Sequence, residues 1–161
     1  MGLIGDSILI LLSTFREDKR VKKGKEKNSN LPKSKEMEIQ NLERRAADGN
    51  YEQYYTLGLM FLQDSSVGYD PQRAIGYFDK GRKMKNFNCS YAGALYYKGH
   101  WSYQHVDDYN SYMWYLDATD CTTNNPEFMK EAKRAINEDF KVTSTKKDGI
   151  KITMIKDVKI L

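Results

Sequence analysis

Residues 51–81 read YEQYYTLGLMFLQDSSVGYDPQRAIGYFDKG, and residues 88–118 read NCSYAGALYYKGHWSYQHVDDYNSYMWYLDA. Each stretch has an apolar stripe at helical spacing with a glycine inside it, then a loop that ends in Asp, then a second apolar stripe. The first stripe of the first stretch consists of Tyr54, Leu57, Gly58 and Phe61. We therefore expect each stretch to form two helices joined by a loop.

The second stretch repeats the first. Gly93 follows Gly58 by 35 residues, and Asp107 follows Asp70 by 37 because the second loop is two residues longer. Tyr96 lies three residues after Gly93, as Phe61 lies three residues after Gly58. The second stripes correspond as well, since Ala74, Tyr77, Phe78 and Gly81 are matched by Ser111, Trp114, Tyr115 and Ala118. A period in the mid-thirties predicts helical hairpins, which must stack because one hairpin cannot bury its own apolar face.

Two residue types in these stretches have specific predicted roles. A glycine inside a helix costs about 1 kcal/mol against alanine, so Gly58 and Gly93 indicate close approach of a neighbouring helix. Asp70 precedes Pro71, and this pair suits a helix N-cap followed by the first helical position. We expect Asp107 to cap the last helix of the second stretch in the same way.

These residues resemble the Sel-one-like repeat, a relative of the tetratricopeptide repeat. The resemblance covers residues 36–120 and depends on Leu57-Gly58-x-x-Phe61, on Asp70 with Ala74 and Tyr77-Phe78, and on Trp114-Tyr115-x-x-Ala118. It implies a right-handed α-solenoid that serves as a scaffold or adaptor for protein partners. The loop at 63–67 lacks the family's usual glycines, and an unrelated small helical bundle is the alternative.

Further helices are expected on either side of the two hairpins. Ser34 is a candidate cap for a helix that runs to Ala47 and ends at Gly49, as the second half of an incomplete leading repeat. A helix over 126–139 is expected to cover the other end of the array. The predicted helical repeat domain therefore spans residues 35–140.

The chain before this domain divides into two segments. Residues 1–15 form a short apolar N-terminal segment, which is too short for a bilayer span and lacks the basic start of a signal peptide. We expect it to pack on the body or on a partner, or to form a shallow membrane anchor. Residues 16–34 form a basic, flexible linker, and Lys22, Lys23 and Lys25 suit either a solvated tether or an arm on anionic lipid or RNA.

The tail over residues 141–161 changes to alternating periodicity. Asp148-Gly149 between two alternating runs predicts a β-hairpin. An isolated two-stranded hairpin is marginal in water, so it requires its own helices, a third strand from Ile8–Leu12, or the sheet edge of a partner.

Charge and cysteine content limit the classes of function. The net charge of +4 divides into an excess of six positive charges in residues 16–35, four in residues 141–161, and a net −5 over residues 36–140. An acidic body with basic tails is not the basic stripe of a nucleic-acid-binding fold. Cys89 and Cys121 do not form the hairpin pairs of secreted relatives of the resembled family, so we expect an intracellular, reducing compartment, with peripheral membrane association if the anchor alternative holds.

Candidate catalytic and metal-binding residues are few. The two histidines, His100 and His105, share a loop with Asp107 and Asp108, but the spacing lacks the known zinc patterns. Cys89 lies near a helix start, where a thiol pKa can fall, although a buried structural cysteine is the more ordinary interpretation. Phosphate-binding loops and nucleophile motifs are missing from the sequence, so we expect neither enzyme activity, nor a metal, nor a cofactor, nor a small-molecule substrate.

Aromatic residues in the second hairpin predict a recognition surface. Trp and Tyr anchor protein interfaces, so we expect Tyr97, Trp101 and Tyr103 to bind a partner protein, together with Thr56 and Met60 of the first hairpin. The alternative is that the longer second loop folds back and buries Trp101. The sequence thus predicts a protein–protein interaction scaffold, or else a structural subunit of a large ribonucleoprotein or membrane-associated complex that docks through its basic tails. Deletion of residues 1–34 distinguishes these two, since only the subunit would be released from its partner.

Overall fold

A computed structural model describes residues 31–145 and 149–155 of the chain. The described residues are mostly helical, with a small antiparallel sheet at the C-terminal end. The elements are α2 (Lys33–Ala47), α3 (Glu52–Gln63), α4 (Pro71–Lys83), α5 (Phe87–Tyr97), the 3-10 helix η1 (Tyr103–His105), α6 (Asp108–Thr119), α7 (Pro126–Glu138), β1 (Phe140–Thr145) and β2 (Gly149–Met154). The predictions for the apolar segment 1–15, most of the linker and a strand at Ile8–Leu12 lie outside these residues.

Side-chain caps fix where four of the helices begin. The Asp70 carboxylate accepts the Arg73 backbone N–H at 3.0 Å, and the Asp107 carboxylate accepts the Asn110 N–H at 2.9 Å. Asn86 and Asn125 cap α5 and α7 in the same way, and Pro71 and Pro126 each occupy a first-turn position. Each cap satisfies a backbone donor that the helix leaves unpaired, so the predicted roles of Asp70 and Asp107 are confirmed.

Helix α2 differs from its predicted start. The helix begins at Lys33, one residue before Ser34, and Pro32 occupies the capping position without a side-chain hydrogen bond. Ser34 therefore lies in the first turn, and its prediction as the cap is wrong. The prediction at the other end is confirmed, because Gly49 has φ of 100°, a left-handed conformation that terminates a helix at little cost for glycine.

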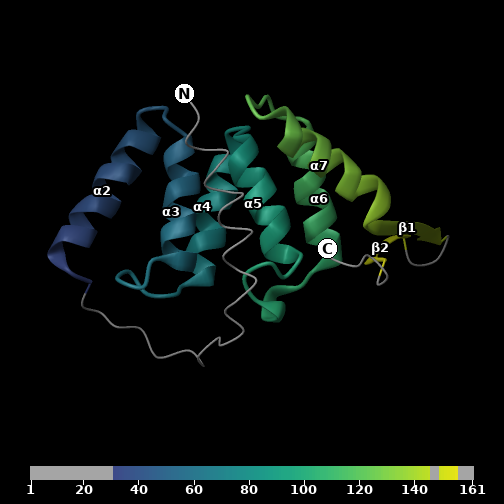
Figure 1. Cartoon of the computed structure of the whole chain (residues 1–161), viewed down its shortest axis with the longest axis horizontal. Helices are drawn as coiled ribbons and strands as arrows, with labels where there is room; N and C mark the ends of the chain where they lie inside the picture. Colours follow the sequence, from purple (N-terminus) through teal and green to yellow (C-terminus); the bar gives the residue numbers. More distant parts are fainter. Residues whose placement is uncertain (1–30, 146–148, 156–161) are drawn as a thin grey trace.

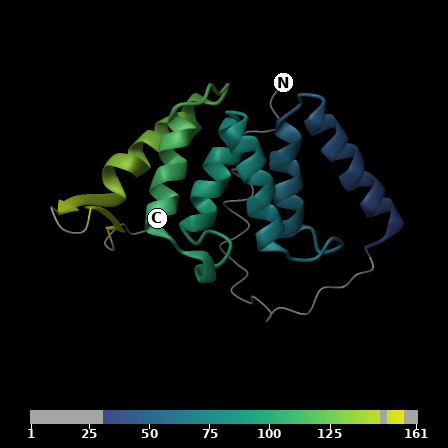
Figure 2. The same cartoon turned by 180° about the vertical axis from the view of Figure 1, so that it is seen from behind.

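The helices follow one another across the molecule in chain order, from α2 at one end to α7 and the hairpin at the other (Figures 1 and 2). Each helix packs against the next one in the chain, and α3 also packs against α5. Among the described residues, no helix is both long enough and apolar enough to cross a bilayer.

Hydrogen bonds also join α2 to α4, α3 to α5, and α4 to α6. The Tyr77 hydroxyl of α4 donates to Glu43 of α2 at 2.6 Å. Asn88 of α5 donates to Glu52 of α3 at 2.8 Å, and Arg82 of α4 donates to Asp117 of α6 at 2.7 Å. These partners lie 34, 36 and 35 residues apart, close to the offsets of 35 and 37 residues in the sequence repeat.

The two stripe glycines allow aromatic rings to approach a helix backbone. A Cβ at Gly58 would overlap the Phe78 ring, and one at Gly93 would overlap the Trp114 indole. Both glycines thus face a ring from the second helix of their own hairpin, and the predicted close approach is confirmed. The hairpins differ by one position, since Phe78 is the eighth residue after Asp70 whereas Trp114 is the seventh after Asp107.

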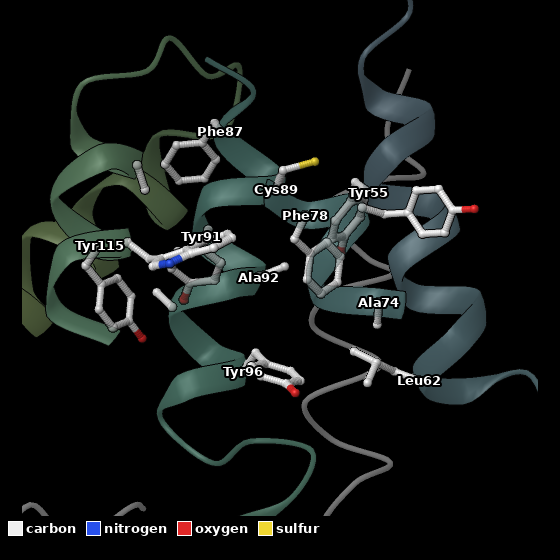
Figure 3. Packing of buried hydrophobic residues seen from close by; sticks show 14 of the residues in the cluster. Tyr55, Leu62, Ala74, Phe78, Phe87, Cys89, Tyr91, Ala92, Tyr96 and Tyr115 are labelled. Carbon is white, nitrogen blue, oxygen red and sulfur yellow. The ribbon is translucent and has the colours of Figure 1, made fainter. Parts of the chain in front are cut away.

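Aromatic side chains make up much of the core (Figure 3). Phe61 stacks on Tyr77 with ring centroids 5.8 Å apart, and Tyr91 of α5 stacks on Phe128 of α7 at 5.6 Å. The residues that define the repeat are buried, namely Leu57, Gly58, Phe61, Ala74, Tyr77, Phe78, Gly93, Tyr96, Trp114, Tyr115 and Ala118. Burial of the Tyr77 hydroxyl beside Glu43 raises its pKa to about 12. The predicted core positions are therefore confirmed.

The β-hairpin packs on the helices. Strands β1 and β2 pair antiparallel, and the ring of Phe140 contacts Tyr112 and Tyr115 of α6 edge-on. The Met154 N–H donates to the Asp108 carboxylate at 2.8 Å. The sequence left three possible supports for the hairpin: its own helices, a third strand or a partner. In the described residues, its own helices support it.

A buried carboxylate connects this end of the chain to α5. Asp139 is fully buried and forms ion pairs with Lys98, which follows α5, and with Arg134 of α7, at 2.9 Å in the second case. The Asp139 carbonyl also accepts the Ile155 N–H at 2.8 Å. Loss of this carboxylate would leave two cations without their shared partner.

Candidate interaction surface

A groove of about 550 Å³ runs along one face of α3. Its lining residues recur at helical spacing, so they share that face. They are Glu52, Gln53, Tyr55, Thr56, Leu59, Met60, Gln63 and Asp64. The opposite face of α3 carries Gly58 and Phe61, which pack on α4 and hold the helix in place, and the other described helices leave the groove open.

The middle of the groove is apolar. Leu59 is half-buried, and the Met60 side chain is 9% exposed. The ring of Tyr55 lies against Phe78 with centroids 6.2 Å apart, and burial raises the pKa of its hydroxyl. The hydroxyl therefore stays protonated at neutral pH, and the floor carries no charge.

Carboxylates mark the two ends of the groove. Glu52, at the start of α3, accepts hydrogen bonds from the side-chain amides of Asn86 and Asn88 at 3.0 and 2.8 Å. Asp64, at the other end, accepts from the Ser66 hydroxyl at 2.6 Å and from Lys35 at 2.9 Å. These bonds, with that from Ser66 the largest, lower the pKa of Asp64 to about 2, so this end is ionised at neutral pH.

The predicted binding residues do not form one surface. Thr56 and Met60 line the groove on α3, as a binding role requires. Tyr97 is half-buried instead, with its ring 5.2 Å from Tyr96 and 5.9 Å from Trp114, and it does not line the groove. The backbone of Tyr103 begins η1, and its side chain lies outside the described part of the structure.

Trp101 is buried, so the prediction that its indole is accessible to a partner is wrong. The second loop folds back and places the ring 6.3 Å from Phe78 of the preceding hairpin and 4.9 Å from the ring of His100. Within the described residues, its Nε1–H is buried without a hydrogen-bond acceptor. Trp101 therefore extends the core between the two hairpins.

Sequence reasoning missed several groove residues. Gln53, Leu59 and Gln63 line the groove but were not predicted as binding residues. Leu59 and Gln63 lie three and seven positions after Thr56, a spacing that places all three on one helical face. That spacing was the available signal, whereas the aromatic residues of the second hairpin, from which binding was predicted, are mostly buried.

The residues considered for catalysis or metal binding make structural contacts. Cys89 and Cys121 are buried free thiols, and burial raises the pKa of both, so they are thiols rather than thiolates at neutral pH. Asp107 caps α6, and Asp108 binds the Met154 N–H. The His105 ring stacks on Tyr96 at 5.0 Å. Within residues 31–145 and 149–155, no group of three or more His, Cys, Asp or Glu is placed to hold a metal ion.

Comparison of the chain with models of protein families, with curated proteins and with solved structures finds no match in any of the three. The resemblance to the Sel-one-like repeat therefore stays a prediction from the residues quoted above.

Proposed function

We propose that the chain is a non-enzymatic scaffold or adaptor that holds an apolar segment of another protein in the groove on α3. The observation that carries this proposal is the groove itself. It joins an apolar floor at Leu59 and Met60 to polar ends on a helix that is fixed from behind by α4. A helical or extended segment with two or three apolar anchors is the ligand that such a surface accepts.

The arrangement of the helices supports the same function. Hydrogen bonds join α2 to α4, α3 to α5, and α4 to α6, and each connects residues about one sequence period apart, as contacts between neighbouring repeats of an α-solenoid do. On this basis the proposal includes a short right-handed α-solenoid of the Sel-one-like kind. The buried, unpaired thiols favour a reducing intracellular compartment.

Charge narrows the class of partner. Both charged residues in the lining, Glu52 and Asp64, are acidic, and residues 36–140 carry a net charge of −5. A partner segment with apolar anchors and a basic flank would complement this surface, because opposite charges promote association and fix orientation. Lys35 compensates Asp64 in part, so Glu52 is the stronger attraction.

A single substitution in the groove tests the proposal. Thr56→Arg adds a long cation to the floor, whereas Gln72→Arg adds the same group to an exposed position on α4 that does not line the groove. Partners recovered by the tagged full-length chain are quantified by mass spectrometry at low and high salt, and the leading one is purified. We expect Thr56→Arg to reduce its affinity at least about tenfold, which corresponds to about 1.4 kcal/mol, and Gln72→Arg to leave it unchanged. Equal binding by both variants would refute the groove as the binding surface.

A structural role in a large assembly is the second candidate. The observations that favour it are the exposed apolar residues Val142 and Ile150 on the hairpin and the excess of six positive charges in residues 16–35. Replacing Lys22, Lys23 and Lys25 by Gln separates the two candidates. An adaptor that uses the groove keeps its partner, whereas a subunit fastened by its basic segment dissociates, most of all at high salt.

A further inference from the structure

The described chain begins beside one end of the groove. Lys35, in the first turn of α2, binds the Asp64 carboxylate at 2.9 Å, and Asp64 is the last residue of the groove lining. Leu31, the first described residue, packs against the hydrophobic core. Whatever precedes Leu31 therefore starts within reach of the surface on α3.

The preceding sequence contains an apolar stripe at helical spacing. Ile4, Ile8, Leu11 and Phe15 recur at i, i+4, i+7 and i+11. Glu52, Thr56, Leu59 and Gln63 of the groove follow the same spacing along α3. A helix over residues 4–15 would present one apolar face, which is what the floor at Leu59 and Met60 can cover.

Length is also compatible. A helix of 13 residues, such as 3–15, would be about 20 Å long, and the 12 residues of α3 span about 18 Å. A flexible chain of 15 residues, the number in the segment 16–30, would have a typical end-to-end distance of about 20 Å and would give a tethered ligand an effective concentration on the order of millimolar. The tether is therefore long enough to allow either orientation on α3.

Charge is compatible with the segment in either orientation. Residues 16–20 directly follow the apolar stripe and carry three cations, Arg16, Lys19 and Arg20, against two acids, Glu17 and Asp18, so the C-terminal end of the stripe has a net charge of +1. The groove carries acids at its ends, with Asp64 beside the point where the chain enters α2. In either orientation the C-terminal end of the segment would lie near one of the two acidic ends of the groove, with its apolar residues over Leu59 and Met60.

We propose that residues 3–15 of this chain occupy the groove on α3 in the same molecule, and so compete with the partner segment for it. This inference rests on the proposed function, because it assigns a regulator to the same site. A partner must displace the segment, which lowers its apparent affinity by the fraction of molecules in which the groove is free. Binding of the basic linker to an anionic surface would then draw residues 3–15 away from the groove and expose the site.

Paramagnetic broadening in the full-length chain tests the inference. A nitroxide is attached through Ser13→Cys, a position off the apolar stripe, while the native thiols are buried and carry raised pKa values. We expect the amides of α3 to lose most of their intensity and those of α7 to keep theirs. Adding Thr56→Arg should restore the α3 signals, and adding Gln72→Arg should not.

Three results would overturn the inference. The first is equal broadening of α3 and α7, and the second is broadening of α3 that survives Thr56→Arg. The third is broadening seen only when labelled chain is mixed with isotope-enriched unlabelled chain, which would indicate a second copy in the groove. Partner binding separates the two proposals. If α3 is not broadened but Thr56→Arg still weakens the partner, the inference fails and the proposed function stands; if α3 is broadened but partner affinity is insensitive to Thr56→Arg, the proposed function fails.

Discussion

Single residues set the distance between helices in this protein. Gly58, Gly81 and Gly93 face, in order, Phe78, Cys89 and Trp114, and an added Cβ at any of these glycines would overlap its neighbour. Gly76 lies in the interior of α4 as well, but an added Cβ there would meet no atom within 4 Å. The same residue type thus has a packing role at three helical positions and none at the fourth.

Substitution of these glycines by alanine should therefore have opposite effects. Gly93→Ala forces the Trp114 ring or the helices to shift, and we expect a loss of about 1–3 kcal/mol in the free energy of unfolding. Gly76→Ala reduces the backbone freedom of the unfolded chain and should add about 0.5–1 kcal/mol. Urea unfolding of both variants measures the difference. Equal stability would show that Trp114 does not contact the α5 backbone.

His100 should contribute to the pH dependence of stability. Burial, assisted by the Lys98 ammonium, lowers its pKa below the ordinary 6.5 in the folded chain. The unfolded chain binds the proton first as the pH falls, so this residue lowers stability below about pH 6.5 and has no such effect above it. We expect His100→Gln to lose less stability than the wild type between about pH 7 and about pH 5. His105→Gln, in the same loop, is the control, and parallel pH profiles for His100→Gln and the wild type would contradict the prediction.

Trp101 marks the limit of prediction at this scale. Its position outside the apolar stripes was compatible with an exposed anchor or with a buried one, because a loop has no periodicity that assigns a face. The contact that decides between them is with Phe78, 23 positions earlier in the chain. Contacts over that separation depend on how the two hairpins stack, and local sequence patterns do not contain this information.

Most helix boundaries, by contrast, were predictable because their signals are local. Asp70 and Asp107 each accept a hydrogen bond from a backbone N–H three residues later, so the cap and the group that it binds lie in one short segment of sequence. Helix α2 has no such cap, and its predicted start was wrong by two residues. The groove was only partly predictable, since Thr56 and Met60 were identified but the free face of α3 depends on where α4 and α5 lie.

The β-hairpin should be an energetic part of the fold. Phe140 is 5% exposed and covers Tyr112 and Tyr115, so Phe140→Ala should cost about 3–5 kcal/mol by opening a cavity over α6. Val142, two residues along the same strand, is half-exposed, and Val142→Ala should cost less than about 1 kcal/mol. Thermal or urea unfolding compares the two variants. Near-neutral Phe140→Ala would mean that the helices are equally stable without the hairpin.

For the whole molecule, the order of the helices predicts a gradient of local stability. Helix α5 contacts α3, α4 and α6 and has eight buried residues. Helix α2 lies at one end of the row, packs mainly on α3, and buries only Ile39 and Ala46 (Figure 1). Stability in stacked helical units is close to a sum over neighbouring contacts, so units at an end open more readily than those in the middle.

Native-state hydrogen exchange at increasing urea concentration should reveal this gradient. We expect the α2 amides to exchange through local openings whose free energies lie well below that of global unfolding and depend little on urea. The α5 amides should exchange only through global unfolding, with the full urea dependence, because each of their neighbours must separate first. If the α2 amides were as protected as those of α5, Ile39 and Ala46 could not be the main buried contacts of α2, and stability could not be a sum over neighbours in chain order.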